Sequence, residues 1–433
     1  MNDIRMIREN PEEFKRRIET RGEEVNVDHL LALDEKRRAL ITEVEAVKAE
    51  RNAGSKLVGK TKDPGERQNL IAEMSKLGDK ITALDVEAST VAGELHELLL
   101  GLPNLPDPDV PLGKDEHDNV PGPTRGEIRE FDFTPKPHWD LAEELEVIDF
   151  ERAVKIAGSR SYILRGDLAR LQRALIDWML DVHTERHGYL EMQPPYQVSS
   201  DSLVGTSQLP KFADTLFKDH EEDRWLIPTA EVPLTNMYRE EILDGDLLPI
   251  YVTAGTPCFR REKVSAGRDV RGIKRVFQFM KVELVKFVHP DESDRELERL
   301  IGEATYLIDQ LGLPYRLLDL CTGDMGFGSA HTWDIEIWSP GCEEWLEVSS
   351  CTNFREFQAR RANIRYRNEQ GKPAFLHTLN GSALAIPRVI IAIMENNQQE
   401  DGTIVIPEVL RPYMGGKATI GKQRTAGPSK HSA

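Results

Sequence analysis

Two long runs of heptad-spaced side chains most tightly constrain the fold of this 433-residue chain. The first run alternates three- and four-residue steps through Leu30, Leu33, Arg37, Leu40, Val44, Val47 and Arg51. The second run keeps this spacing through Leu70, Met74, Leu77, Ile81, Leu84, Ala88, Val91, Leu95 and Leu98. Such spacing is typical of the apolar seam of a coiled coil. Helix-breaking residues separate the two runs: Gly54, Gly59, Pro64 and Gly65.

The two runs therefore predict an antiparallel helical hairpin whose helices have about 30 residues and a length of about 45 Å. Its expected tip is basic, with Lys48, Arg51, Lys56, Lys60 and Lys62 against Glu50 and Asp63. The whole chain has a net charge of −18, which excludes a general nucleic-acid coat. The tip is either the solvated end of a dimerisation or spacing arm, or a rod that contacts a phosphate backbone.

The length of the chain predicts two or three domains. Residues 1–100 are expected to form an N-terminal domain, and the proline-rich residues 101–137 a linker. A globular catalytic domain is expected over 138–415, with a disordered basic tail over 416–433. No run reaches the roughly 20 apolar residues that cross a membrane, and the N-terminus lacks a signal-peptide core. These features predict a cytoplasmic protein.

The cysteines and glycines exclude several kinds of site. The four cysteines, Cys258, Cys321, Cys342 and Cys351, form no Cys-x-x-Cys pair. We therefore expect neither a disulfide framework nor a structural zinc site. Glycine-rich phosphate loops of the P-loop or dinucleotide-binding type are absent from the sequence.

Residues 256–288 predict two strands joined by a long basic loop. The first strand leads into Arg260, and the loop that follows is rich in lysine and arginine. The return strand should present Val282 and Leu284 to the core, and Phe279 and Glu283 to the opposite face, about 13 Å apart. An aromatic ring, a carboxylate and arginines could bind one extended phosphate-bearing ligand. An ordinary hairpin with a solvated loop is the alternative.

Thr229 and Glu231 lie two residues apart in a loop bounded by prolines. Two such acceptors could bind an ammonium group. The same residues would also suit the start of a helix, with Thr229 as its N-cap.

Two further segments carry candidate ligand groups. Glu347, Ser349 and Ser350 lie on a predicted strand and could bind Mg²⁺ together with ATP phosphates, or could simply be the polar groups of an exposed strand face. Residues 377–388 are expected to open a helix that continues to about Gln399, with Ser382 as a candidate N-cap. Arg388 then lies early in the helix, where its guanidinium could bind phosphate oxygens.

In chain order these motifs resemble the class II aminoacyl-tRNA synthetases, in the form found in seryl-tRNA synthetases. The Phe-Arg-x-Glu of 259–262, the Ser-Ala-Gly-Arg-Asp of 265–269 and the Gln-Phe-x-Lys-Val-Glu of 278–283 resemble motif 2. The expected helix and strand over 168–193 resemble motif 1, and 377–388 resembles motif 3. Motif 3 departs from the common family form, which has glycine where Ala383 and Pro387 stand here.

This resemblance implies an α+β fold, with a class II catalytic domain built on an antiparallel sheet and an N-terminal antiparallel helical-hairpin arm. It implies a serine--tRNA ligase that activates L-serine with ATP to seryl-adenylate. The seryl group would then pass to the 3′ end of tRNA(Ser), with tRNA(Sec) as a second candidate acceptor. It also implies a homodimer that contacts tRNA through the arm tip and the loop of 263–275.

The resemblance also assigns site residues. Arg260 and Arg388 are the expected catalytic residues, which bind the α- and γ-phosphates. The L-serine site is expected to comprise Thr229, Ala230, Glu231, Glu283 and Ser382. The ATP site is expected to comprise Arg260, Arg261, Glu262, Val276, Phe279, Glu347, Val348, Ser349, Ser350 and Arg388. Within that set, Phe279 stacks on adenine, and Glu347 and Ser350 bind Mg²⁺.

Two other interpretations remain open at this point. One is a different adenylating enzyme on the same scaffold, such as an amino-acid:carrier-protein ligase, although the basic arm argues against it. The other is a non-enzymatic coiled-coil interaction protein, which would not need Arg260, Glu347 and Arg388 together.

Overall fold

The computed structural model describes residues 1–262 and 271–423, which form two compact units, Met1–Leu105 and Pro106–Ala433. Most of the predicted basic loop and the end of the predicted tail therefore lie outside the described residues. Within the described ranges, no helix combines the length and apolar character that crossing a bilayer requires.

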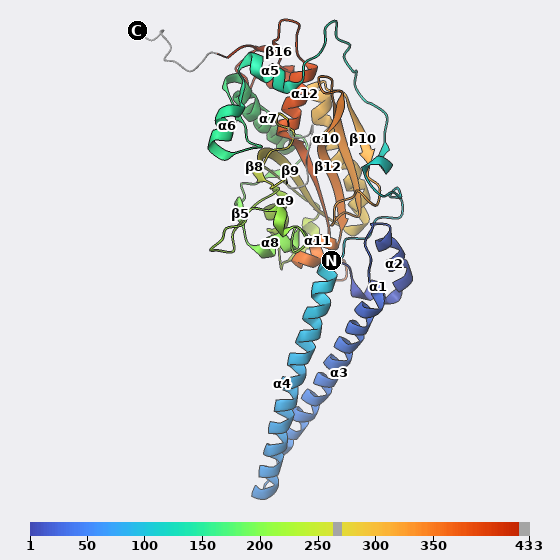
Figure 1. The fold of residues 1–433 in the computed structure, drawn as a ribbon. Coiled ribbons are helices and arrows are strands. Elements are labelled where there is room, and N and C mark those ends of the chain that lie inside the picture. Colours follow the sequence, from blue (N-terminus) through green and yellow to red (C-terminus); the bar gives the residue numbers. More distant parts are fainter. Residues whose placement is uncertain (263–270, 424–433) are drawn as a thin grey trace, which may run out of the picture. The chain divides into compact units, whose positions relative to one another are not determined.

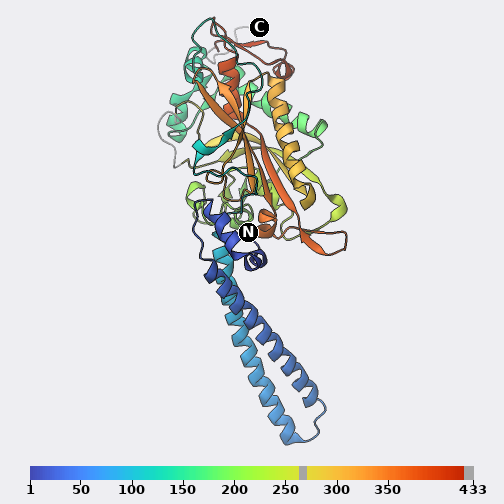
Figure 2. The same ribbon diagram turned by 90° about the vertical axis from the view of Figure 1, so that its right-hand side faces the viewer.

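The first unit consists of two short helices and a long helical hairpin (Figures 1 and 2). Its helices are α1 (Ile4–Glu9), α2 (Pro11–Glu19), α3 (Val27–Val58) and α4 (Pro64–Leu100). The side chain of Asn26 caps α3, and that of Asp63 caps α4 by accepting a hydrogen bond from the Glu66 amide. Pro64 occupies the first turn of α4, where a missing N–H costs little. The predicted antiparallel arm is thus present.

The predicted seam of the arm is buried along most of its length, including Leu30, Leu40, Val91 and Leu95. Leu98 is an exception, since 38 % of its surface is exposed while Leu99 is buried. At this end α1 and α2 add Ile7, Phe14 and Ile18 to the apolar cluster that contains Leu99. The cluster there is no longer a two-helix seam, and a different face of α4 is buried.

An eight-stranded sheet dominates the second unit, with strand order β1-β10-β11-β12-β15-β9-β8-β4. In that order the strands are Val120–Pro121, Tyr315–Asp319, His331–Ser339, Glu344–Arg355, His377–Ala385, Gln278–Val288, Ile250–Phe259 and Leu190–Glu191. Neighbouring strands are antiparallel except for the edge pair of β4 and β8. The predicted α+β class with an antiparallel sheet is confirmed.

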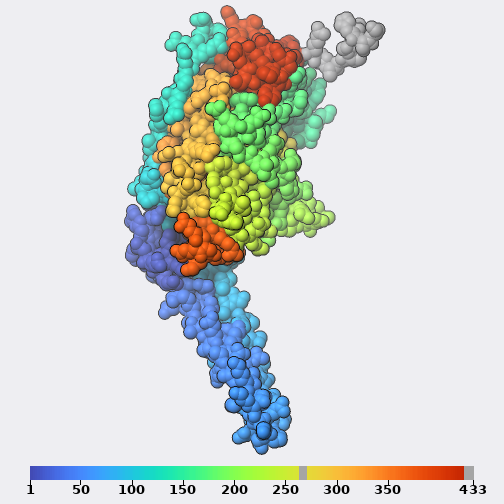
Figure 3. Space-filling view, turned by 180° about the vertical axis from the view of Figure 1, so that it is seen from behind, coloured from blue at the N-terminus to red at the C-terminus, as the bar shows by residue number. Residues whose placement is uncertain are grey.

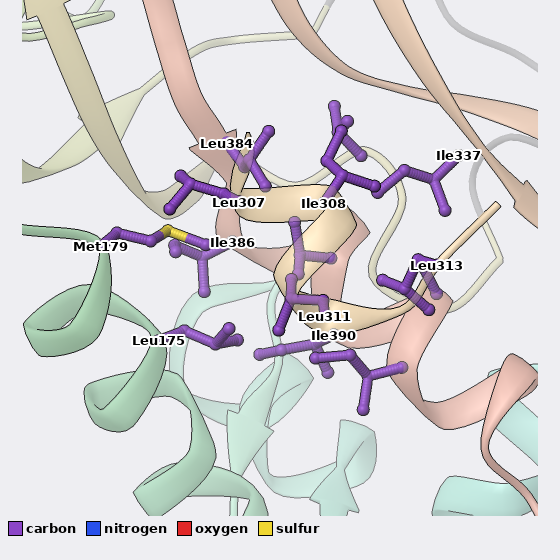
Figure 4. Close-up of a cluster of buried hydrophobic side chains, with 14 of the residues drawn as sticks. Leu175, Met179, Leu307, Ile308, Leu311, Leu313, Ile337, Leu384, Ile386 and Ile390 are labelled. Carbon is purple, nitrogen blue, oxygen red and sulfur yellow. The ribbon is translucent and has the colours of Figure 1, made fainter. Parts of the chain in front are cut away.

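Three helices, α7 (Gly166–Glu185), α10 (Ser293–Leu311) and α12 (Ile386–Asn396), contribute to the main apolar core with the inner strands. Figure 4 shows this core, where Met179 of α7, Leu307 of α10 and Ile386 of α12 converge. In a space-filling view from behind, the golden atoms of α10 lie at the surface of this covered side (Figure 3). The helices therefore close one face of the sheet and leave the other for a ligand.

The remaining elements surround the sheet. The helices are α5 (His138–Leu145), α6 (Phe150–Ala157), α8 (Ser200–Gly205), α9 (Glu231–Asn236) and α11 (Phe357–Ala362). The short strands are β2 (Ile148–Asp149), β3 (Ile163–Leu164), β5 (Gln197–Val198), β6 (Trp225–Leu226), β7 (Ile242–Asp244), β13 (Arg365–Arg367), β14 (Pro373–Phe375), β16 (Ile404–Val405) and β17 (Thr419–Ile420).

Strand β9 is buried on both faces over most of its length, whereas the sequence predicted one core face. Val282 and Leu284 pack in the main core, as expected. On the other face, Val285 and Phe287 pack in a second apolar cluster that includes Ala230. Only the first part of that second face, around Phe279 and Glu283, is left to line a pocket.

The prediction of a helix over 377–388 was wrong for most of that segment. Residues His377–Ala385 form strand β15, which pairs with β12 on one side and β9 on the other. Ser382 therefore lies in a strand, opposite Glu283, and is not a helix cap. Helix α12 begins at Ile386, with Pro387 in its first turn.

The proline-rich segment lacks long helices or strands, but from Pro106 onward it belongs to the second unit. The carboxylate of Asp107 pairs with the guanidinium of Arg355 at 2.7 Å. Further along, Val120 and Pro121 pair with β10 at the sheet edge. The guanidinium of Arg129 donates hydrogen bonds to the backbone carbonyls of Asn396, the last residue of α12, and of Gln398 beyond it. This segment is thus attached along the second unit.

Replacing Leu307 by alanine should destabilise the second unit by about 2–5 kcal/mol, because Leu307 is fully buried and its loss leaves a cavity. Urea unfolding followed by tryptophan fluorescence measures this change. Leu112→Ala makes the same chemical change at a side chain that is 73 % exposed, and should change stability little. Equal losses in the two variants would contradict the described core.

Candidate active site

An open pocket of about 380 Å³ lies on the sheet face that the three helices leave free. The predicted site residues that line it are Thr229, Glu231, Arg260, Glu262, Val276, Phe279, Glu283, Glu347, Val348, Ser350, Ser382 and Arg388. The sheet brings these residues together from β9, β12 and β15, together with α9, α12 and the segment after β8.

Three predicted site residues do not line the pocket. Ala230 packs in the second apolar cluster, where it precedes α9. Arg261 extends toward Phe217, 5.9 Å from the ring centroid. Ser349 alternates with its neighbours on β12, and its hydroxyl donates a hydrogen bond to the carbonyl of Ser382 at 2.7 Å.

One end of the pocket is formed by two buried carboxylates, Glu283 and Glu231. The Thr229 hydroxyl donates a hydrogen bond to Glu283 Oε2 at 2.6 Å, and the Lys281 ammonium forms an ion pair with the same carboxylate. The buried Lys281 thus forms an ion pair within the pocket wall.

The second carboxylate, Glu231, is held by a relay from two other elements. Gln358 of α11 donates its amide to Glu231 Oε1 at 2.6 Å, and its own oxygen accepts a hydrogen bond from Thr378 at 2.7 Å. Burial raises the pKa of Glu231 to about 7, and the negative charge of Glu283 contributes. The Gln358 hydrogen bond and the charges of Lys281 and Arg260 oppose this rise. Because this pKa lies near neutral pH, binding of a cation here would favour the ionised form of Glu231.

The predicted helix start is present with Glu231 in its first turn, but its N-cap residue is Ala230 and not Thr229. Helix α9 begins at Glu231, and the Glu231 amide donates to the Thr229 hydroxyl oxygen at 3.2 Å. The same hydroxyl directs its proton to Glu283. The helix start therefore orients the polar groups of the pocket.

The middle of the pocket is aromatic and cationic. The guanidinium of Arg260 lies 5.3 Å from the centroid of the Phe279 ring and donates to the carbonyl of Pro228 at 3.3 Å. Glu262 has a positive φ of 39° and pairs with Arg275 at 3.5 Å. A flat ring with an attached anion would find a stacking surface and a positive charge here.

The far end of the pocket combines oxygen ligands with a second guanidinium. Arg388 Nη1 donates to the carbonyl of Glu347 at 2.6 Å and lies 3.3 Å from its carboxylate. Ser350, on the same wall, lies opposite Asp334 of β11. Burial and the charge of Glu347 raise the pKa of Asp334 well above its usual range, against the effect of its hydrogen bond with Ser350.

Two loops of the wall were not assigned to the site from the sequence. They contribute Thr206, Ser207, Gln208 and Phe212 from one loop, and Gly326, Phe327, Gly328 and Ser329 from the other. At Gly328 the loops approach so closely that an added Cβ would lie 2.7 Å from the Ser207 hydroxyl. The glycines of 323–328 were the sequence signal for this approach. Several strand residues that line the pocket were also not assigned to it from the sequence, among them Lys281, Thr332, Thr352 and Asn380.

Comparison with protein families assigns both units of the chain. Residues 1–106 match the seryl-tRNA synthetase N-terminal domain. Residues 213–397 match the tRNA synthetase class II core domain (G, H, P, S and T). Together these ranges span more than half of the chain.

Curated relatives match over nearly the full length. The serine--tRNA ligase of Thermomicrobium roseum is 60 % identical over 424 residues, covering 98 % of this chain and 95 % of the relative. That of Herpetosiphon aurantiacus is 57 % identical over 423 residues, covering 97 % and 100 %.

Solved structures share the fold. The seryl-tRNA synthetase from Pyrococcus horikoshii complexed with ATP has a TM-score of 0.90 and 39 % identity, covering 98 % of this chain and 100 % of that one. The cytoplasmic serine-tRNA ligase from Naegleria fowleri in complex with AMP has a TM-score of 0.86 and 29 % identity, covering 98 % and 99 %.

Replacing Lys281 by methionine should destabilise the protein more at pH 8.5 than at pH 6. Folding raises the pKa of Glu231, so the stability due to its protonated form is lost as pH rises through about 7. Without the Lys281 charge this pKa rises further, and the loss extends to higher pH. Thermal unfolding at the two pH values measures the difference.

Lys274→Met is a matched control, because Lys274 is a buried lysine paired with Glu344. It should destabilise the protein similarly at both pH values. An equal loss of thermal stability at pH 6 and pH 8.5 in Lys281→Met would contradict the electrostatic effect of Lys281 on the pKa of Glu231.

Proposed function

The chain belongs to the seryl-tRNA synthetase family, and from that premise we propose how its pocket activates serine. It is an aminoacyl-tRNA ligase: L-serine reacts with ATP to give seryl-adenylate and pyrophosphate, and the seryl group then passes to the 3′ end of tRNA(Ser). The observation that carries the proposal is the polarity of the pocket, which has buried carboxylates at one end and arginines toward the other.

Serine occupies the carboxylate end. Its ammonium group contacts Glu231 and the Thr229 loop, since a buried carboxylate favours a cation. Its hydroxyl group hydrogen-bonds to Glu283, with Ser382 beside it on the neighbouring strand. Alanine would leave Glu283 without this hydrogen bond, and the desolvation cost of that group would oppose its binding.

ATP occupies the rest of the wall. Adenine stacks on Phe279, and Glu262 borders the nucleotide. Arg260 contacts the α-phosphate, which places a positive charge where the reaction occurs. Arg388 leaves the Glu347 carboxylate to contact the γ-phosphate, because a phosphate is the stronger partner for a guanidinium.

The chemical step joins the two ends. A carboxylate oxygen of serine attacks the α-phosphorus in line, a new P–O bond forms, and the bond to the pyrophosphate leaving group breaks. The reaction needs no protein nucleophile. The pocket instead positions the reactants and neutralises charge.

We also propose Mg²⁺ as the metal that accompanies ATP. The carboxylate of Glu347 and the hydroxyl of Ser350 share one wall of the pocket, and hard oxygen donors of this kind suit Mg²⁺. When bound, the metal would neutralise phosphate charge. Glu347 would exchange its contact with Arg388 for the metal.

We also propose which parts of the chain bind tRNA and which form a dimer interface. The arm tip binds tRNA(Ser) through its lysines, and the loop of 263–275 contacts the 3′ end. A homodimer forms through α7 and the edge strand β4, whose Leu190 is 64 % exposed. A cytoplasmic location stays a prediction from the sequence.

Glu283→Ala should lower serine-dependent ATP–pyrophosphate exchange by about 100-fold or more, because the serine hydroxyl loses its charged acceptor. The thermal midpoint should show that the protein is folded. Glu400→Ala removes an exposed carboxylate and should leave exchange unchanged. Unchanged exchange kinetics in Glu283→Ala would show that the specificity assignment is wrong.

Deleting residues 35–95, with a short glycine–serine bridge, should spare adenylate formation, because every residue that lines the pocket belongs to the second unit. Charging of tRNA(Ser) should fall by about 100-fold or more as phosphate contacts are lost. Exchange and charging assays on the same preparation separate the two steps. If the deletion variant charged tRNA(Ser) at the parental rate, the arm would not contribute to tRNA binding and would act only as a spacer.

A further inference from the structure

Asp334 of β11 does not itself line the pocket, but it lies across from Ser350, one of the proposed metal ligands. Its strand neighbour Thr332 lines the pocket and shares a hydrogen bond of 3.0 Å with Thr352 across the strand pair. Side chains two residues apart share a face, so Asp334 points the same way. Its direct partner across the pair is Ser350. Such partners lie about 5 Å apart, within reach of one shared ligand.

The Asp334 carboxylate is incompletely satisfied. Its Oδ1 atom is buried and has no hydrogen-bond partner. The charges that act on it most strongly are those of other carboxylates, first Glu347, then Asp324 and Glu336. Among residues 1–262 and 271–423, no lysine or arginine forms an ion pair with it. A buried carboxylate in this position is costly.

Two guanidinium groups pair with the carboxylates that neighbour Asp334. Arg316 pairs with Glu336 at 2.6 Å, and Arg388 pairs with Glu347. Other buried carboxylates in the chain have partners. Glu395, for example, accepts hydrogen bonds from the backbone amides of His138 and Gly341. The orphan oxygen of Asp334 therefore indicates a cation that binds together with the substrate.

We propose that Asp334 is a further ligand of the divalent cation that Glu347 and Ser350 bind, directly or through one water molecule. Two carboxylates and a hydroxyl, completed by phosphate oxygens, form the hard-oxygen set that Mg²⁺ accepts. The inference rests on the proposed ATP site. It adds a residue on a different strand, so that β11 and β12 both hold the metal.

Asp334→Asn keeps the shape of the side chain and removes its charge. With saturating α,β-methylene-ATP, the Mn²⁺ affinity of this variant should fall by about 10-fold or more, measured by electron paramagnetic resonance of free Mn²⁺. Without metal or nucleotide, in EDTA, its thermal midpoint should rise by about 1–3 °C, because repulsion with Glu347 is relieved. A residue with a purely structural role would lower the midpoint and leave the Mn²⁺ affinity unchanged.

Glu336→Gln is the matched control, since Glu336 lies two residues along the same strand but has Arg316 as its partner. It should lower the thermal midpoint and change the Mn²⁺ affinity by less than about twofold. Asp334→Ser is the second variant if the asparagine variant does not fold. Failure of both to fold would show that the carboxylate serves the fold, and would overturn the proposal.

Glu347→Gln separates this inference from the proposed function. Loss of Mn²⁺ affinity in Glu347→Gln with parental affinity in Asp334→Asn would overturn the role of Asp334 and leave the metal site in place. Parental affinity in both variants would overturn the proposed site itself. We expect both Glu347→Gln and Asp334→Asn to lose Mn²⁺ affinity, and Glu336→Gln to keep the parental affinity.

Discussion

Two buried carboxylates beside a single buried lysine are the constraint on which one end of the pocket depends. Glu231 and Glu283 share the ammonium of Lys281 at one end of it. Two other buried charges have several direct partners of opposite sign: Asp34 contacts three arginines, and Lys286 contacts two carboxylates at 3.0 Å each. Since burying an unbalanced charge is costly, the excess indicates that a cationic ligand completes the pocket.

The fold supplies what such a site needs. Strand β9 is packed against helices on one face and presents Lys281 and Glu283 on the other. Strand β15 lies between β9 and β12, so Glu283 and the segment of Glu347 and Ser350 stand two strands apart in one sheet. Side chains on packed strands lose little further entropy when a ligand binds. The distance between Phe279 and Glu283 at one side of the pocket and Glu347 at the other is thus set by backbone geometry.

Local periodicity made part of this structure predictable. The heptad seam of the arm and the faces of β9 follow from side-chain spacing alone. The segment 377–385 was wrongly predicted as a helix, because Ser382 before an apolar run suits a helix cap, and only pairing with β9 and β12 makes it a strand. The loops that meet at Gly328 converge through tertiary structure. Asp334 and Glu336 look equivalent in the sequence, and only the register across the sheet shows that one of them lacks a cation.

The central claim is that the carboxylate end selects serine through its ammonium and hydroxyl groups. Amino-acid-dependent ATP–pyrophosphate exchange by the parental chain, with serine, alanine and threonine compared, tests it most directly. We expect rapid exchange with serine and a kcat/KM about 10⁴-fold lower with alanine, which has no hydroxyl to donate a hydrogen bond to Glu283. Threonine should be rejected by lack of room. Exchange supported by another amino acid and not by serine would contradict the account.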